Sequence, residues 1–186
     1  MRINRSKKVI LLAHCILNGN AKVQGLCKYP SSITELITIL LENEIGIIQL
    51  PCPEMMTYGV KRWGHVREQF NTPYFRNECQ RIMMPIIDQL KDYIKNDYKV
   101  AGVIGIEGSP SCGVNKSCSG AWGGEISGDQ DILDRINKLE SVSKPGIFME
   151  EIKELLNKNN ISIPFAVVDE VNVPQSIDQI KRFIME

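Results

Sequence analysis

The chain has 186 residues, a length that suits one ordinary domain. Lys and Arg together number 22, as do Asp and Glu, so the formal net charge is zero, which argues against a nucleic-acid binder that works through a strongly basic surface. Hydrophobic residues make up 43% and charged residues 24%, a mixture typical of a globular protein and not of a disordered one. We therefore expect a single domain over residues 1–186 with a sizeable core.

The apolar segments of the sequence argue against a membrane span and against a secretory signal peptide. No apolar run approaches the ~20 residues of a membrane span. The stretch 9–13, which follows a basic start, is too short for the core of a signal peptide. We expect a cytoplasmic protein with no membrane partner. Thiols stay reduced in that compartment, so the six cysteines favour metal binding or thiol chemistry over a disulfide framework.

Short apolar runs rich in Val and Ile predict buried parallel strands. They are Lys8–Ala13, Gly46–Leu50, Val100–Ile106 and Ile163–Val168. Stripes of apolar residues with helical spacing lie between or after them, at 33–41, 75–94, 148–156 and 177–184. This order predicts an α/β fold with a doubly wound, mostly parallel four-stranded sheet of the Rossmann-like type and helices on both faces.

Two stretches interrupt this regular pattern. Pro85 falls inside the second helical stripe and predicts a kink or a break there. The Gly-rich stretch 113–146 predicts a long loop that holds a short helix around Ile132 and Ile136. Long loops in compact domains are usually functional or disordered.

Three of the cysteines closely follow three of the predicted strands. Cys15 lies two residues past the first strand, Cys52 two residues past the second, and Cys112 shortly past the third. Open α/β sheets bind their ligands at the carboxyl ends of the strands. With the strand order 2-1-3-4 and a spacing of ~4.8 Å, three adjacent strand ends bring these thiols within roughly 10 Å. The sequence therefore predicts one site that the fold assembles from distant segments.

Three thiolates around one centre leave a coordination position open. A structural zinc site normally has four ligands, whereas a catalytic metal keeps one position free. A cubane iron–sulfur cluster also normally takes four cysteines, and thiolates favour zinc, Cu(I) or iron–sulfur centres. The alternative is that these cysteines are small buried apolar residues. We prefer that interpretation for Cys79, on a helical stripe, and leave Cys27 and Cys118 open between core packing and loop thiols near the site.

The sequence around these cysteines resembles a known family. The blocks Cys15-Ile16-Leu17-Asn18, Cys52-Pro53-Glu54 and Ser109-Pro110-Ser111-Cys112-Gly113 look like the three signature blocks of the thiouracil desulfidase family, and most closely those of a related branch of it. The resemblance extends from residue 9 to residue 170, and the third block is the most specific.

The resemblance implies a [4Fe-4S] cluster held by Cys15, Cys52 and Cys112, with the fourth iron free to bind the sulfur of a small thiolated substrate. Ser109 and Glu54 stand at motif positions suited to acid–base chemistry or to orienting the substrate. Turn chemistry around Pro110 and a solvated carboxylate are their alternatives. The chain departs from the family in two places. Met55-Met56-Thr57-Tyr58-Gly59 replaces the Gly-Gly-Leu that typically follows Cys-Pro-Glu, and the Cys-Arg-Tyr turn that usually follows the first block closely has its nearest match, Cys27-Lys28-Tyr29, several residues later. The thiolated substrate therefore stays open.

Aromatic and basic residues after the second block complete the predicted pocket. The stretch 61–67 mixes cations with Trp63 and His65, which suits a heteroaromatic or anionic substrate. Tyr58 and Trp122 are further substrate-binding candidates. A solvated loop and core packing are the alternatives for these residues.

Three functions remain open at this point. The first is a cluster-dependent desulfidase, an enzyme that cleaves a carbon–sulfur bond. The second is a non-catalytic module that binds zinc or a cluster, and the third is a metal-free binder of small molecules. A dinucleotide site and a P-loop are disfavoured because neither glycine motif follows the first strand.

Overall fold

A computed structural model describes residues 4–125, 127 and 131–185 of the protein. Its main sheet has four parallel strands in the order β2-β1-β3-β6. Their bounds are β1 (Lys8–Leu12), β2 (Gly46–Gln49), β3 (Lys99–Ile106) and β6 (Phe165–Val168). The structure confirms the predicted strands and the predicted order of neighbours.

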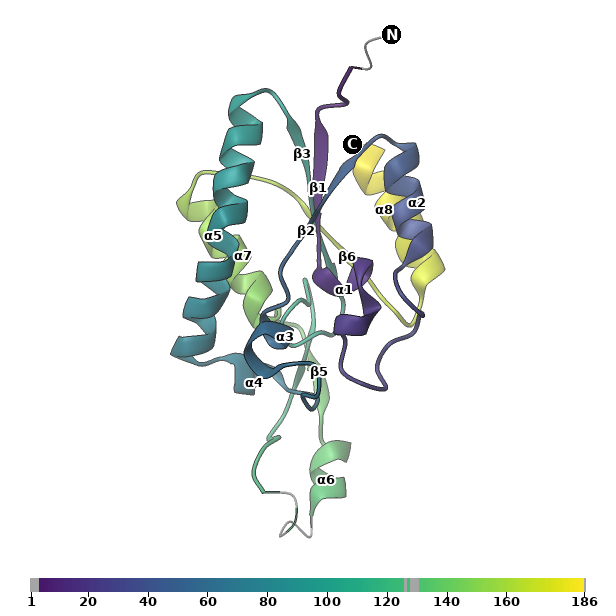
Figure 1. The fold of residues 1–186 in the computed structure, drawn as a ribbon. Coiled ribbons are helices and arrows are strands. Elements are labelled where there is room, and N and C mark those ends of the chain that lie inside the picture. The colour runs from purple at the N-terminus through teal and green to yellow at the C-terminus, as the bar shows by residue number, and fades with distance from the viewer. Residues whose placement is uncertain (1–3, 126, 128–130, 186) are drawn as a thin grey trace.

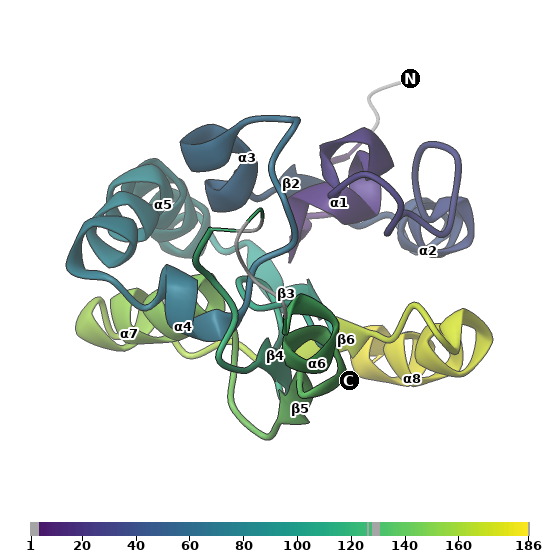
Figure 2. The same cartoon turned by 90° about the horizontal axis from the view of Figure 1, so that it is seen from below.

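Helices cover both faces of this sheet (Figures 1 and 2). One pair is α2 (Thr34–Glu42) with α8 (Val173–Met185), and the other is α5 (Pro73–Lys95) with α7 (Ile147–Lys158). The predicted doubly wound architecture is therefore confirmed. Of the kink or break expected at Pro85, the break is wrong, because α5 runs through this residue as one helix, and the kink stays a prediction.

The core lies where the central strands pack between the two helical layers. Ile10, Leu11 and Leu12 of β1 are fully buried, as are Val103 and Ile104 of β3. Strands covered on both faces read as continuous apolar runs, which explains why the sequence identified them. The carboxyl ends of all four strands point to the same edge of the sheet, shown at the bottom of Figure 1.

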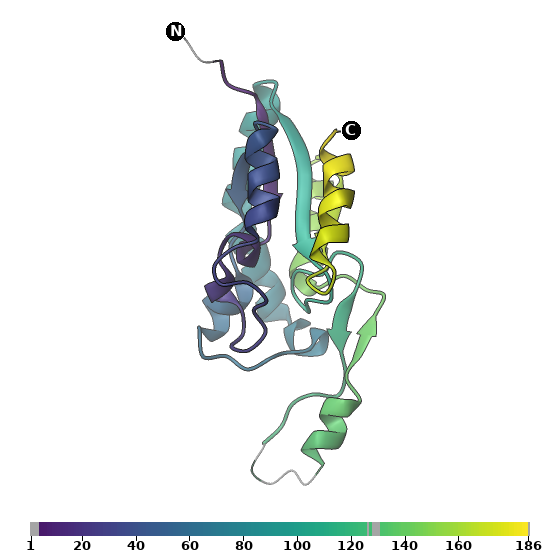
Figure 3. The same ribbon diagram turned by 90° about the vertical axis from the view of Figure 1, so that its right-hand side faces the viewer.

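Short elements gather at this edge (Figure 2). They are α1 (His14–Leu17), the 3-10 helix η1 (Gly19–Ala21), α3 (Pro53–Tyr58) and α4 (Arg67–Phe70). An arm extends beyond them (Figure 3) and consists of β4 (Ser117–Ser119), α6 (Ile132–Asn137) and β5 (Glu140–Val142). The short helix was predicted, whereas the antiparallel β4–β5 pair was not.

The membrane prediction was also compared with the structure. Within the described part of the chain, no helix is both long enough and apolar enough to cross a membrane.

Candidate functional site

The three predicted thiols lie within electrostatic reach of one another at the carboxyl edge of the sheet. Cys15 follows β1, Cys52 follows β2, and Cys112 lies in the loop after β3, so the three come from neighbouring strands. The Cys112 thiol interacts electrostatically with both Cys15 and Cys52, and Cys15 interacts with Cys52. All three are free cysteines. The fold thus brings together the residues that the sequence singled out.

Cys15 is positioned by the tight junction between β1 and α1. The Ala13 N–H donates to the carbonyl of Ile104 on β3 (2.9 Å), which fixes the end of β1 against its neighbour. The Tyr29 hydroxyl donates to the Cys15 carbonyl (3.0 Å), and the Gln49 amide donates to the His14 carbonyl (3.0 Å). The backbone that carries the first thiol is therefore held from both sides.

Cys52 occupies the N-cap of α3. Its Sγ accepts from the Met55 N–H at 3.4 Å, and Pro53 begins the helix, where the missing N–H of proline costs nothing. The Cys-Pro-Glu block thus encodes a helix start. It also places Glu54 in the first helical turn, next to the sulfur.

Cys112 is held by a loop that packs tightly against the start of α7. The N–H groups of Ile147 and Met149 donate to the carbonyls of Pro110 (3.0 Å) and Ser111 (3.1 Å). A Cβ at Gly113 would lie 2.0 Å from the Lys116 carbonyl oxygen. Only glycine tolerates that approach, which explains the glycine after Cys112 in the third block.

Burial determines the acidity of these thiols in the protein alone. It raises the pKa of Cys15 to about 12 and raises the pKa values of Cys52 and Cys112 as well. The Met55 N–H partly offsets this for Cys52. Buried thiolates need a compensating positive centre, which a bound metal supplies.

The donor set was compared with the predicted cofactors. Among residues 4–125, 127 and 131–185, no group of three or more His, Cys, Asp or Glu side chains is arranged to hold a single metal ion. This geometry by itself supports neither a zinc ion nor a cluster. The donor chemistry suits both, because three neighbouring thiols are the soft donors that zinc and iron–sulfur clusters take.

Glu54 belongs to a buried hydrogen-bonded chain beside Cys112. The Ser111 hydroxyl donates to Glu54 Oε1 at 2.5 Å, and the Ser109 Oγ lies 3.3 Å from the Ser111 Oγ. Because the Ser111 hydrogen points to Glu54, the Ser111 oxygen is left to accept from Ser109. The Cys112 N–H in turn donates to the Ser109 Oγ at 3.0 Å. The two predicted acid–base residues are therefore connected through Ser111.

Arg62 fixes the other side of the Glu54 carboxylate. Its Nε donates to Glu54 Oε2 (3.1 Å), and its two terminal nitrogens donate to the carbonyls of Gly59 (3.2 Å) and Ala21 (2.7 Å). Both side chains of the ion pair are almost fully buried. Arg62 thus connects the segment after Cys15 with the helix after Cys52. The sequence analysis did not single it out within its basic stretch.

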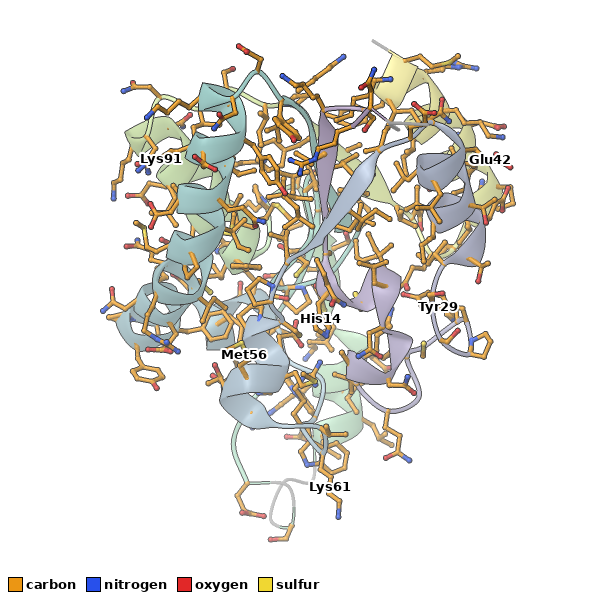
Figure 4. All side chains as sticks on the ribbon, turned by 45° about the horizontal axis from the view of Figure 1, so that its top comes forward. His14, Tyr29, Glu42, Met56, Lys61 and Lys91 are labelled. Atoms are coloured by element: carbon orange, nitrogen blue, oxygen red, sulfur yellow. The ribbon has the colours of Figure 1, made fainter. Side chains whose placement is uncertain are left out.

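A second charged group lies beside Cys15. Lys22 forms an ion pair with Glu170 Oε2, and its ammonium lies 5.7 Å from the centre of the Tyr29 ring. Lys22 lowers the pKa of the Cys15 thiol and Glu170 raises it, so both lie within electrostatic reach of the sulfur. Figure 4 labels Tyr29 beside α1, close to the edge where His14 begins that helix.

Within the described part of the chain, four buried polar side-chain atoms have no hydrogen-bond partner. They are His14 Nε2, His65 Nδ1, Glu107 Oε2 and Glu170 Oε1. The other His14 nitrogen, Nδ1, donates to the Leu50 carbonyl oxygen at 3.1 Å. Unpaired buried polar groups are uncommon and often mark ligand sites.

The predicted substrate-binding residues gather around one cavity. Trp63, His65 and Trp122 line a cavity of about 190 Å³, and Tyr58 packs against His65 with tilted rings whose centres are 4.6 Å apart. The Trp122 indole N–H donates to the Gly64 carbonyl (3.1 Å), which docks the arm onto this segment. Tyr58 and His65 both interact electrostatically with Glu54, so the cavity adjoins the cysteine site. Substrate binding by these four residues stays a prediction.

The remaining cysteines lie elsewhere. Cys79 is fully buried on α5, as expected of a core residue. Cys27 is exposed and donates to the Tyr29 carbonyl (2.9 Å), and Cys118 is half-buried on β4. The structure assigns neither of these two residues a position among the three clustered thiols.

The sequence analysis missed Arg62, Lys22 and Glu170 as parts of the site. Glu170 follows the last strand, so the rule that ligands bind at the carboxyl ends of strands would have found it. Lys22 and Arg62 carry no such signal. Their roles depend on how loops fold back toward the sheet, which no local pattern encodes.

The chain was compared with known proteins. No family model matches it. It is 40% identical over 113 residues to the uncharacterized protein MJ0003 of Methanocaldococcus jannaschii, a match that covers 61% of this chain and 72% of the archaeal protein. Among solved structures, it is similar to a [4Fe-4S]-dependent thiouracil desulfidase, with a TM-score of 0.49 and 18% identity, over 94% of this chain and 99% of that one. The chain belongs to the same family as MJ0003.

Proposed function

We propose that this member of the MJ0003 family is a cytoplasmic, iron–sulfur-dependent desulfidase. Its substrate would be a small thiocarbonyl compound, a thiolated nucleobase or a related thioamide, and it would need no nucleic-acid or membrane partner. The cofactor would be a [4Fe-4S] cluster held by Cys15, Cys52 and Cys112.

One observation carries the proposal: three free thiols from three neighbouring strands interact with one another at the carboxyl edge of the sheet. The three residues come from separate segments, so only the tertiary fold brings them together. Buried thiolates repel one another, and a bound metal would offset that repulsion. The resemblance of the three sequence blocks to thiouracil desulfidases supports the same conclusion independently.

The reaction is a hydrolysis that balances without an oxidant or a reductant. The oxygen of one water molecule forms a bond to the thiocarbonyl carbon, the carbon–sulfur bond breaks, and the sulfur leaves as hydrogen sulfide with both protons of the water. The product is the corresponding carbonyl compound. When bound, a cluster with only three protein ligands supplies a soft Lewis acid that polarises the carbon–sulfur bond.

The protein's own residues would move the protons. Ser109 is half-buried and reaches the Glu54 carboxylate only through the Ser111 hydroxyl. A proton taken from the attacking water at Ser109 Oγ can pass to Ser111 and then to Glu54 as each hydroxyl hydrogen shifts to its neighbour. Glu54 is thus the final base, and the two serines connect it to the substrate.

Arg62 would keep Glu54 ready for this role. Its buried guanidinium donates to the second carboxylate oxygen and so fixes the orientation of the carboxylate toward Ser111. Since Arg62 acts through Glu54, it is a positioning residue. The aromatic walls of Trp63 and Trp122 would receive a flat heterocycle by stacking.

Anaerobic reconstitution tests the proposal. The purified protein is loaded with iron and sulfide under argon and incubated with 2-thiouracil, 4-thiouracil and thioacetamide, and released sulfide is measured. We expect catalytic release from at least one of the three compounds, with formation of the carbonyl product. A protein that binds the cluster and releases sulfide from none of them would contradict the proposed activity.

A further inference from the structure

The Glu170 carboxylate is only half satisfied. Lys22 holds Oε2, whereas Oε1 is buried and has no hydrogen-bond partner. The side chain as a whole is 14% exposed, so water reaches little of it. A carboxylate oxygen in this state lacks a donor, and leaving it unpaired is costly.

The neighbours of Glu170 do not offer that donor. The Tyr29 hydroxyl interacts with the Glu170 side chain, but it has one hydrogen, and that hydrogen is donated to the Cys15 carbonyl at 3.0 Å. The Lys22 ammonium is engaged with Oε2. Any further hydrogen bond to Oε1 therefore has to come from a molecule that enters the site.

The position of Glu170 restricts what that molecule is. The carboxylate lies within electrostatic reach of the Cys15 thiol, one of the three that would hold the cluster. A thiocarbonyl substrate held beside these thiols would have the atoms next to its carbon within reach of Glu170. In thioamides and thioureas, one of those atoms is a nitrogen that carries a hydrogen.

We propose that Glu170 Oε1 accepts a hydrogen bond from the N–H adjacent to the thiocarbonyl carbon, and that the site thereby selects thioamides and thioureas with a free N–H. This inference rests on the proposed function and names its substrate class more closely. Lys22 and Tyr29 act as positioning residues that hold the carboxylate and the Cys15 backbone in place.

This arrangement discriminates because an N-alkylated substrate leaves the buried oxygen unpaired. Sites built to hydrogen-bond a substrate reject analogues that lack the donor far more strongly than apolar pockets reject a missing methylene. We expect a preference for the free N–H of at least about 30-fold in kcat/KM.

Methylated substrates test the inference in the reconstituted protein. 6-Methyl-2-thiouracil keeps both N–H groups and adds a methyl on carbon, whereas 1,3-dimethyl-2-thiouracil lacks both N–H groups. We expect sulfide release from the first at close to the rate with 2-thiouracil, and at least about 30-fold slower release from the second. Similar rates for the two methylated compounds would overturn the inference and leave the proposed desulfidase activity standing.

A variant and a binding measurement assign the effect to Glu170. Glu170→Gln replaces a carboxylate oxygen, which only accepts, by an amide whose N–H₂ group can face the N–H of the ligand. Two donors repel each other, so we expect the preference for the substrate with free N–H groups to fall to within about three-fold. Iron content equal to that of the wild type shows that the variant is loaded. A preference that persists undiminished in the loaded variant overturns the assignment. If the variant does not load, the wild-type substrate pair decides.

Calorimetric binding of the oxygen counterparts provides a readout that needs no turnover. We expect 6-methyluracil to bind the wild type more tightly than 1,3-dimethyluracil does, and Glu170→Gln to remove this difference. Equal binding of the two to the wild type would count against the inference. Absence of sulfide release from every compound, together with selective binding of 6-methyluracil, would instead refute the activity and retain the Glu170 contact.

Discussion

Two carboxylates lie within electrostatic reach of the Cys15 thiol, and they differ in how their oxygens are used. Glu54 has one oxygen on Arg62 and the other on Ser111, so both are occupied. Glu170 has one oxygen on Lys22 and the other without a partner. Hydrogen bonds to both oxygens fix the orientation of the Glu54 carboxylate, which suits proton transfer. The Glu170 carboxylate has one oxygen that can still accept a hydrogen bond from a ligand. The comparison separates an acid–base side of the site from a recognition side.

The two sides also differ in what the sequence reveals. Glu54 and both serines fall within blocks next to the cysteines, where local spacing places them. Glu170 lies 155 positions after Cys15, and only the pairing of β3 with β6 brings it to the same edge. Recognition residues of this kind come from the tertiary structure and not from the motif.

The largest effect on iron binding and on sulfide release is expected from removing one of the three clustered thiols. Cys112→Ser replaces a thiolate by a hydroxyl that binds iron poorly, so we expect loss of the brown colour after reconstitution and no sulfide release above background. Visible absorption and a sulfide assay measure the two. Cys27→Ser changes an exposed thiol and should retain both properties. Equal loss in both variants would mean that cysteine content, and not this site, matters.

The acid–base side is tested by Glu54→Gln. The amide keeps the shape of the side chain but cannot accept a proton, so we expect kcat to fall by about 10²–10⁴ while iron content is retained. Ser111→Ala, which interrupts the chain between Ser109 and Glu54, should lower kcat in the same direction. A Glu54→Gln variant with unchanged kcat would remove Glu54 from the mechanism.

Breaking the buried ion pair is expected to cost stability. Arg62→Met leaves the Glu54 carboxylate buried without its cation, and we expect the free energy of unfolding to fall by about 3–5 kcal/mol. Denaturant titration measures it. The double variant Arg62→Met/Glu54→Gln removes the stranded charge and should recover part of this loss. Strictly additive losses would show that the two side chains do not act as a pair.

The smallest expected effect concerns pH. Burial lowers the pKa of His65, with Arg62 acting in the same direction and Glu54 and the Trp63 backbone opposing it. The unfolded chain therefore takes up a proton before the folded protein does, and stability falls as the pH drops below about 6.5. His65→Phe keeps a ring between Tyr58 and Phe70. Between about pH 7.5 and pH 5, we expect the Tm of this variant to fall less than the Tm of the wild type. Parallel Tm curves would exclude His65 as the titrating group.

Much of the fold was predictable because its signals are local. The central strands are continuous apolar runs, and the four long helices carry apolar stripes. The β4–β5 pair was not predictable in the same way, since its three-residue strands are too short for any periodicity. The continuity of α5 through Pro85 also depends on tertiary packing, which overrides the local preference of proline.

The candidate site follows the same division. The strand-end rule predicted that the three cysteines would meet, and the structure brings their thiols within electrostatic reach of one another. The rule did not predict which loops would supply the surrounding charges. Arg62 crosses from the segment after α3 to the carbonyl of Ala21, a contact that joins residues 41 positions apart.

The most direct test of the central claim is the iron and acid-labile sulfide content of the wild-type protein after anaerobic reconstitution. A cluster on Cys15, Cys52 and Cys112 predicts about four iron and about four sulfide per chain. A protein that retains neither iron nor sulfide, or that holds one zinc ion in their place, would contradict the account.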